Sequence, residues 1–144
     1  MLYLKRTIDA FLSEWKANPD KKPLIVKGPR QVGKTESIQR FAAENYTSVI
    51  TINFVEEPKY KMITADGYKA ADIIKNISRI DPSKRFIEGE TLIFFDELQE
   101  FPDIATALKF FKIDGRFDVI CSGSMLGLNY RKIESNSVGY KTDY

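Results

Sequence analysis

The chain has 144 residues, of which 43% are hydrophobic and 29% charged, so we expect one globular domain with a real core. Its 22 basic and 20 acidic side chains nearly balance, which gives no electrostatic reason to expect a nucleic-acid partner. The absence of histidine excludes His-based metal sites and Ser–His or Cys–His nucleophile pairs.

A few further features of the sequence indicate where in the cell the protein is expected. Cys121 is the single cysteine, so it forms no internal disulfide and a reducing, cytoplasmic compartment is expected. The acidic residues Asp9 and Glu14 interrupt any signal-peptide pattern at the start of the chain. No apolar run approaches the ~20 residues that a membrane helix needs. We therefore expect no membrane partner.

Helical and strand patterns alternate along the chain. Apolar residues at helical spacing predict helices within residues 4–15, 38–42, 73–80 and 104–111. Apolar or β-branched runs predict strands at residues 23–26, 48–54, 91–95 and 117–121. A single helical turn is expected at 60–63, before Gly67, and Gly115 is expected to cap the last of these helices. The alternation predicts an α/β fold with a mostly parallel sheet and helices on both faces.

The end of the chain carries weaker patterns. A polar stretch runs through Ser137, and residues 138–140 look like the beginning of a fifth strand. We therefore expect a sheet truncated near its fifth strand, in a fragment of a longer protein. The alternative is a complete minimal domain with a disordered tail.

One motif fits a phosphate-binding loop, or Walker A motif, at every fixed position of G-x-x-x-x-G-K-[ST]. Its residues are Gly28, Pro29, Arg30, Gln31, Val32, Gly33, Lys34 and Thr35. The two glycines allow a tight turn and a close approach of the backbone to phosphates. Backbone N–H groups and the positive end of the following helix would face the phosphate oxygens. Lys34 would contact the β and γ phosphates, and the Thr35 hydroxyl would hold Mg²⁺.

A second motif, of the Walker B type, follows the apolar run that ends at Phe95. Its strand carries Asp96 and Glu97 to the carboxyl edge of the sheet, where open α/β folds bind ligands. We expect Asp96 to hold Mg²⁺ or its waters and Glu97 to orient the attacking water. Alternatively, the two acids only cap the following loop.

Two serines stand at the end of the fourth predicted strand. Ser122 or Ser124 could contact the γ phosphate and report its hydrolysis, and the sequence does not separate them. A simple turn hydroxyl is the alternative role for either serine.

Three blocks together, residues 22–35, 91–100 and 122–127, resemble prokaryotic AAA-type ATPases that carry a C-terminal DUF4143 domain. The resemblance implies a P-loop NTPase three-layer sandwich of the AAA+/STAND kind over residues 1–144, followed by a longer C-terminal region. It also implies ATP as the nucleotide. Self-association or contact with that C-terminal region is expected, because AAA-type sites often take an arginine from a neighbour.

One departure from that family concerns a Gly-Arg pair expected before the fifth strand. Residues 138–140 read Val-Gly-Tyr, without arginine, and Arg131 or Lys132 would have to substitute. Either is otherwise a solvated helix charge.

The sequence supports three hypotheses of function. The first is a Mg²⁺-dependent ATPase, and the second is a nucleotide-gated interaction module that binds ATP or ADP with little turnover. The third is a small-molecule kinase. Residues 59–61 are a weak candidate for the lid that such an enzyme closes over its acceptor. The adjacent Asp96 and Glu97 favour water as the acceptor.

Overall fold

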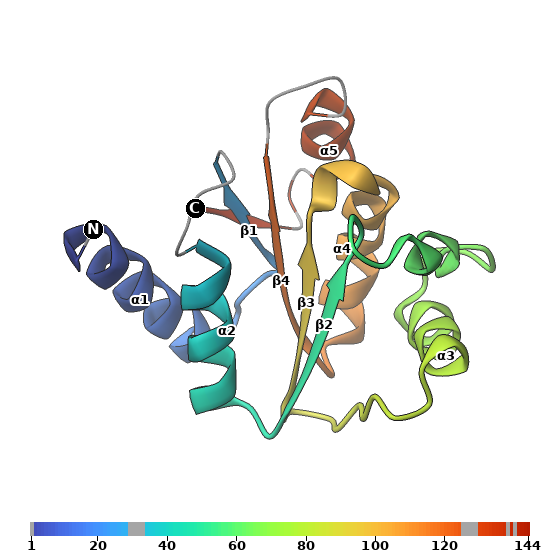
Figure 1. The fold of residues 1–144 in the computed structure, drawn as a ribbon, viewed down its shortest axis with the longest axis horizontal. Coiled ribbons are helices and arrows are strands. Elements are labelled where there is room, and N and C mark those ends of the chain that lie inside the picture. Colours follow the sequence, from blue (N-terminus) through green and yellow to red (C-terminus); the bar gives the residue numbers. More distant parts are fainter. Residues whose placement is uncertain (1, 29–33, 125–129, 138, 140) are drawn as a thin grey trace.

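A parallel sheet lies between two layers of helices (Figure 1). The computed structural model describes residues 2–28, 34–124, 130–137, 139 and 141–144. The strands are β1 Leu24–Lys27, β2 Ser48–Asn53, β3 Thr91–Asp96, β4 Asp118–Gly123 and β5 Thr142–Asp143. Their order is β2-β3-β4-β1-β5, and all four neighbouring pairs are parallel. The predicted α/β three-layer sandwich with a parallel sheet is confirmed.

The helices divide between the two faces of the sheet. They are α1 Leu2–Ala17, α2 Lys34–Asn45, α3 Ala70–Ile80, α4 Asp103–Asp114 and α5 Tyr130–Ser137. Figure 1 shows α1 and α2 on one side and α3, α4 and α5 on the other. Two short 3₁₀ helices, η1 Pro58–Met62 and η2 Leu98–Glu100, follow the carboxyl ends of β2 and β3. No helix in the described part of the chain is long and apolar enough to cross a membrane.

The interior strand β3, which lies between β2 and β4, is buried on both faces, as its continuous apolar run predicts. Leu92 and Phe94 join the core beneath α1 and α2, whereas Ile93 and Phe95 join the core beneath α3, α4 and α5. Successive side chains of a strand point to opposite faces. The phase of this alternation places the Asp96 side chain, two residues after Phe94, on the face that carries α2.

The first helix is anchored over the amino end of β1. Leu12 is fully buried, and Trp15 packs beside it while its indole Nε1 donates a hydrogen bond of 2.7 Å to the carbonyl of Lys22. Burying one such side chain contributes about 1.5–3 kcal/mol. At the opposite face, Gly115 ends α4 with a φ of 71°, the left-handed conformation that glycine adopts most readily.

Two elements near the end of the chain were only weakly indicated by the sequence. Residues 130–137, expected only as a polar stretch, form α5, and its Ile133 is fully buried in the core that also holds Ile104 of α4. A fifth strand is present at Thr142–Asp143, where it pairs with Leu24 and Ile25 of β1. Val138 and Tyr140 lie outside the described residues.

Candidate functional site

The predicted motif residues meet at the carboxyl edge of the sheet. Gly28 follows β1 directly and has a φ of 145°, a backbone conformation that residues with a Cβ rarely adopt. Lys34 begins α2, and its Nζ donates to the Gly28 carbonyl at 3.3 Å, so the lysine reaches back across the loop. The other predicted loop residues, 29–33, lie outside the described residues.

Lys34 is a half-buried cation without full compensation. Burial lowers its pKa, and the nearby carboxylates of Asp96 and Glu97 partly oppose that shift. A group with additional negative charge beside Lys34 would favour its ammonium form. Phosphate oxygens would supply that charge, and the N-terminus of α2 at this point favours an anion for the same reason.

Thr35 and Asp96 meet although they lie on different elements. The Thr35 hydroxyl donates to Asp96 Oδ2 at 3.4 Å, while Asp96 is only 6% exposed. Burial is the main cause that raises the pKa of Asp96, and the Glu97 backbone N–H and Lys34 oppose the shift. A hydroxyl beside a buried carboxylate is a pair of oxygen groups of the kind that Mg²⁺ prefers as ligands. Within the described ranges, no cluster of three or more acidic or cysteine side chains offers a metal site of another kind.

Asn53 belongs to this group and was not predicted from the sequence. It ends β2 in register with Asp96 of β3, and its Nδ2 donates to Asp96 Oδ2 at 3.4 Å. Its Oδ1 accepts from the backbone N–H groups of Val55 and Glu56, which fixes the amide. The sequence signal, a polar residue at the carboxyl end of an apolar strand, was present, but its meaning depends on β2 lying next to β3.

Glu97 occupies an unusual backbone conformation. Its φ of 61° and ψ of 48° lie in the left-handed region, and within the described residues it is the one non-glycine with positive φ. Such residues carry strain of roughly 1–3 kcal/mol and concentrate at functional sites. The Glu97 N–H donates to Asp96 Oδ1 at 2.9 Å, and Glu97 Oε2 accepts from Gln99 Nε2 at 2.7 Å. Asp96 therefore contacts Thr35 and Asn53 from other segments, whereas these two bonds of Glu97 are local to residues 96–99.

The two candidate serines have different environments. Ser122 of β4 is fully buried, and among the described residues its Oγ has no hydrogen-bond partner. It is in register with Val26 of β1 and Asp96 of β3, so its side chain shares the face of Asp96. A buried hydroxyl without a partner costs about 1–3 kcal/mol, so the Ser122 Oγ would gain from a hydrogen bond with a ligand at this edge. Ser124 follows the strand, and its backbone N–H donates to Gln99 Oε1 at 3.0 Å.

The two residues considered as substitutes for the expected Gly-Arg pair, Arg131 and Lys132, are on the surface of α5. Arg131 and Lys132 are exposed, and Lys132 forms an ion pair of 3.0 Å with Asp103 of α4. Lys27, at the end of β1, instead pairs with Glu134 of α5 at 2.8 Å.

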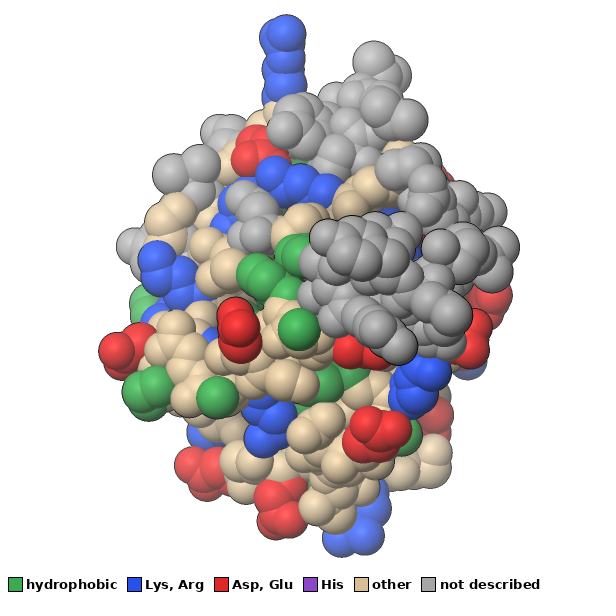
Figure 2. Space-filling model, turned by 90° about the vertical axis from the view of Figure 1, so that its left-hand side faces the viewer, with side chains coloured by type: hydrophobic (Ala, Val, Ile, Leu, Met, Phe, Trp, Pro, Cys, Tyr) green, Lys and Arg blue, Asp and Glu red, His purple; other side chains and the backbone are tan. Residues whose placement is uncertain are grey.

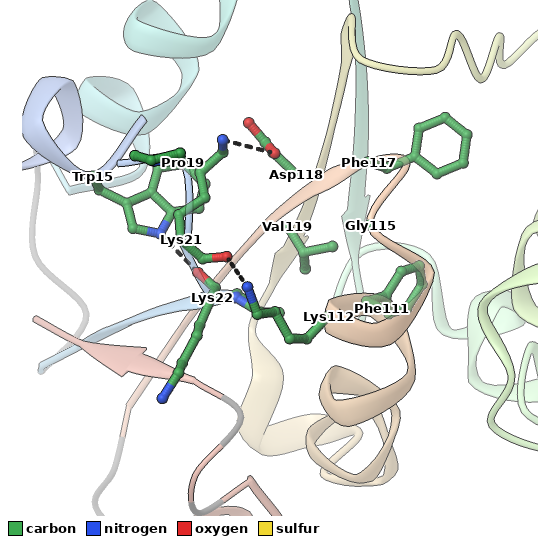
Figure 3. Close-up of a pocket in the computed structure, with 11 residues that line it drawn as sticks. Trp15, Pro19, Lys21, Lys22, Phe111, Lys112, Gly115, Phe117, Asp118 and Val119 are labelled. Atoms are coloured by element: carbon green, nitrogen blue, oxygen red, sulfur yellow. Dashed lines mark hydrogen bonds and ion pairs between the residues drawn. The ribbon is translucent and has the colours of Figure 1, made fainter. Parts of the chain in front are cut away.

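A separate cavity of about 110 Å³ lies at the opposite, amino edge of the sheet (Figure 3). The lining residues include Trp15 of α1, Lys21 of the turn before β1, Lys112 of α4 and Asp118 of β4. Its polar groups are engaged within the fold: Lys21 pairs with Asp118 at 3.6 Å, and Lys112 donates to the Lys21 carbonyl at 3.1 Å. This cavity is therefore distinct from the motif residues and holds the turn between α1 and β1 against α4.

Charged side chains of both signs are interspersed over the face that Figure 2 presents. This arrangement agrees with the near balance of 22 basic and 20 acidic residues. A basic stripe of the kind that binds a nucleic-acid backbone would instead concentrate one sign.

Comparison with known proteins identifies the fold. A family model described as "AAA domain" matches residues 20–144, which is most of the chain. No curated protein sequence matches. The structure resembles that of Caenorhabditis elegans PCH-2 with a TM-score of 0.54 and 12% identity, covering 97% of this chain and 42% of the other.

A second neighbour is Drosophila ORC bound to DNA, with a TM-score of 0.59 and 11% identity over 99% of this chain and 90% of the other. Drosophila ORC bound to AT-rich DNA and Cdc6 gives 0.59 and 11%, covering 55% of that chain. At these identities the likeness establishes the fold alone. The chain spans less than half of the PCH-2 chain and just over half of this second ORC chain. Fold, motif order and family match agree, and this chain belongs to the AAA domain family.

Proposed function

We propose that this chain binds ATP with Mg²⁺ and hydrolyses it. The observation that carries the proposal is the meeting of Lys34, Thr35, Asp96 and Glu97 at one edge of the sheet, although they come from two segments far apart in the chain. This is the arrangement that phosphoryl transfer to water requires: a cation for the phosphates, oxygen ligands for the metal and a carboxylate for the water.

The residues fit a Mg²⁺–nucleotide complex by their chemistry. Thr35 and Asp96 would hold the metal ion, directly or through its waters, and the ion would neutralise charge on the phosphates. Burial lowers the pKa of Lys34, and phosphate oxygens beside it would stabilise its ammonium form. Gly28, Arg30, Gln31, Val32 and Gly33 would supply backbone N–H groups to the phosphates. Pro29 has no N–H, and its fixed φ would help to set the turn of the loop.

Glu97 is the residue that we assign to the attacking water. Glu97 comes directly after the buried Asp96 at the edge of the sheet. Its carboxylate is close enough to Lys34 to oppose the lowering of that lysine's pKa by burial. A carboxylate in this place orients a water and accepts its proton as the water attacks phosphorus. Asn53, which bonds Asp96 at 3.4 Å, would hold that carboxylate in place for the metal ion.

Ser122, rather than Ser124, is our choice for the group that contacts the nucleotide. Its buried Oγ, without a partner among the described residues, lies on the face of Asp96. Ser124 lies beyond the end of β4, and its backbone N–H donates a hydrogen bond to Gln99 Oε1.

A second candidate is a nucleotide-gated interaction module with little turnover. The sequence at 138–140 lacks the arginine that the resembled family carries there, and Lys132 is engaged with Asp103. An arginine supplied by another copy, or by the DUF4143 region that the resemblance implies, would then be needed for rapid turnover. We accordingly propose that residues 1–144 are the ATPase part of a longer, self-associating cytoplasmic protein.

A kinase or a DNA-binding role receives less support. Tyr60, the centre of the candidate lid, is buried in the core rather than facing an acceptor site. Two structural neighbours were solved with DNA, but at 11% identity they carry no such role to this chain.

Phosphate release separates these candidates. Wild type, Glu97→Gln and the surface variant Lys75→Ala would be incubated with Mg²⁺ and ATP, and inorganic phosphate would be followed over several turnovers. We expect turnover in wild type and Lys75→Ala and a fall of at least about 10²-fold in Glu97→Gln with ATP still bound. Tight binding without turnover in all three would favour the gated module, and a phosphorylated acceptor would favour the kinase.

A further inference from the structure

Gln99 connects two parts of the site through its side-chain amide. It lies in η2, two residues after Glu97, and its Nε2 donates to Glu97 Oε2 at 2.7 Å. Its Oε1 accepts from the backbone N–H of Ser124 at 3.0 Å. One side chain thereby joins the acid that follows β3 to the tip of β4.

The chemistry of the two partners selects an amide at position 99. The Ser124 N–H can only donate, and the ionised Glu97 carboxylate can only accept. A glutamine amide offers an acceptor to the first and a donor to the second, so its orientation is defined by both bonds. A carboxylate at this position would accept from Ser124 but repel Glu97, and an apolar side chain would make neither bond.

Gly123 provides the space for this bridge. It is buried at the end of β4, and a Cβ placed there would lie 2.6 Å from Gln99 Oε1 and 3.0 Å from the backbone nitrogen of Leu98. Both distances are shorter than ordinary van der Waals contacts of carbon with nitrogen or oxygen. Any larger residue at 123 would push the Gln99 amide away from Ser124.

We propose that Gln99 is the positioning residue of Glu97 and ties its carboxylate to the strand tip that carries Ser122 and Ser124. This inference rests on the proposed function, since it gives the bridge a role in hydrolysis. The left-handed backbone of Glu97 is strained, and the 2.7 Å bond from Gln99 Nε2 fixes the direction of its carboxylate. A shift in the nucleotide-contacting strand tip would pass through Gln99 to the catalytic carboxylate.

Two substitutions of Gln99 separate positioning from bulk. Gln99→Met keeps the length of the side chain and removes both bonds, so we expect kcat to fall about tenfold while ATP affinity stays within about twofold. Gln99→Glu keeps the bond with Ser124 and places a second carboxylate against Glu97, so at about pH 8 its kcat should be at least as low.

The pH profile of Gln99→Glu identifies the bond to Glu97. When the introduced carboxyl takes up a proton, it becomes a donor and restores the missing bond. The ratio of its kcat to that of wild type should therefore rise from about pH 8 to about pH 5.5. Lys34 and Asp96 also face Glu97, but they are common to both proteins, so their titration cancels in the ratio. A loop brace without a catalytic role would leave this ratio flat.

The same variants give a readout that does not depend on turnover. In ¹⁵N-labelled protein with bound nucleotide, Gln99→Met and Gly123→Ala should both move the Ser124 amide proton upfield, because each removes its acceptor. Glu97→Gln should move the Gln99 side-chain amide signals. The surface variant Lys75→Ala should move neither.

The outcomes decide the inference and the proposed function separately. A Gln99→Met kcat within about twofold of wild type, or a flat pH ratio, would overturn positioning. Nucleotide binding without hydrolysis in wild type would refute the hydrolytic function, and the amide signals would then decide whether Gln99 bridges Glu97 and Ser124. Unmoved signals would overturn the bridge.

Discussion

Replacing Glu97 by glycine and, separately, by alanine tests whether its left-handed backbone is strained. Both substitutions remove the carboxylate and its bond with Gln99, so these losses cancel in the comparison. What remains is the backbone at φ 61° and ψ 48°, which glycine adopts without a Cβ penalty and alanine does not.

The expected difference follows from two opposing contributions. A Cβ in the left-handed helical region costs about 1–2 kcal/mol. Glycine loses more conformational freedom on folding than alanine, which offsets roughly 0.5–1 kcal/mol. The free energy of unfolding of Glu97→Gly should therefore exceed that of Glu97→Ala by about 1 kcal/mol. For a domain of this size the corresponding difference in Tm is roughly 2–4 °C.

Urea denaturation of both variants, with Tm as a second measurement, is the assay. The matched control is the same pair at Lys75, an exposed position inside α3, where glycine should be less stable than alanine by about 1 kcal/mol. The order of the two variants should thus reverse between positions 97 and 75. If Glu97→Ala were as stable as Glu97→Gly, the inference of strain would be wrong. Neither variant should hydrolyse ATP at the wild-type rate, whatever its stability.

Three further predictions concern other residues. Thr35→Val should weaken ATP binding about tenfold in the presence of Mg²⁺ but only slightly in EDTA, and calorimetry measures both affinities. Equal losses of affinity in both conditions would argue against a role of Thr35 in holding the metal ion. Burial raises the pKa of Asp96, so the folded protein binds more protons than the unfolded chain between the ordinary Asp pKa and the raised value. The wild-type free energy of unfolding should therefore gain from Asp96 as pH falls through the raised pKa, and Asp96→Asn should lack this gain in urea titrations; identical pH slopes would count against it. Cys121 is fully buried and its thiol pKa is raised by burial, so a thiol reagent should modify it only after unfolding in guanidinium, and rapid labelling of the folded protein would contradict that burial.

Much of the fold follows from local patterns in the sequence. The apolar run of β3 predicted a strand buried on both faces, and Gly115 predicted the end of α4, because each signal depends on neighbouring residues alone. The burial of α5 was not predicted, since the buried Ile133 packs into a core whose other residues lie far away in sequence; only two solvated helix charges were expected there. The stability of α5 depends on contacts with residues distant in sequence, and the spacing of apolar residues within a segment does not reveal such contacts.

The site divides in the same way. Lys34 and Asp96 stand in motifs of fixed spacing, so their convergence could be anticipated. Asn53 and Gln99 could not, because their roles arise from the order of strands and from the 3₁₀ turn after β3. The choice of Ser122 over Ser124 likewise needed the phase of the pleat, which places Ser122 beside Asp96.

The most direct test of the account is the binding of Mg²⁺–ATP to wild type and Lys34→Ala, with Lys75→Ala as the matched surface control. Titration of a fluorescent ATP analogue measures Kd, and circular dichroism checks that each protein is folded. We expect saturable binding in wild type and Lys75→Ala and a loss of at least about tenfold in Lys34→Ala, since its cation contacts the phosphates directly. Folded wild type that binds no nucleotide, or equal affinity in Lys34→Ala, would contradict the assignment of this edge of the sheet as an ATP site.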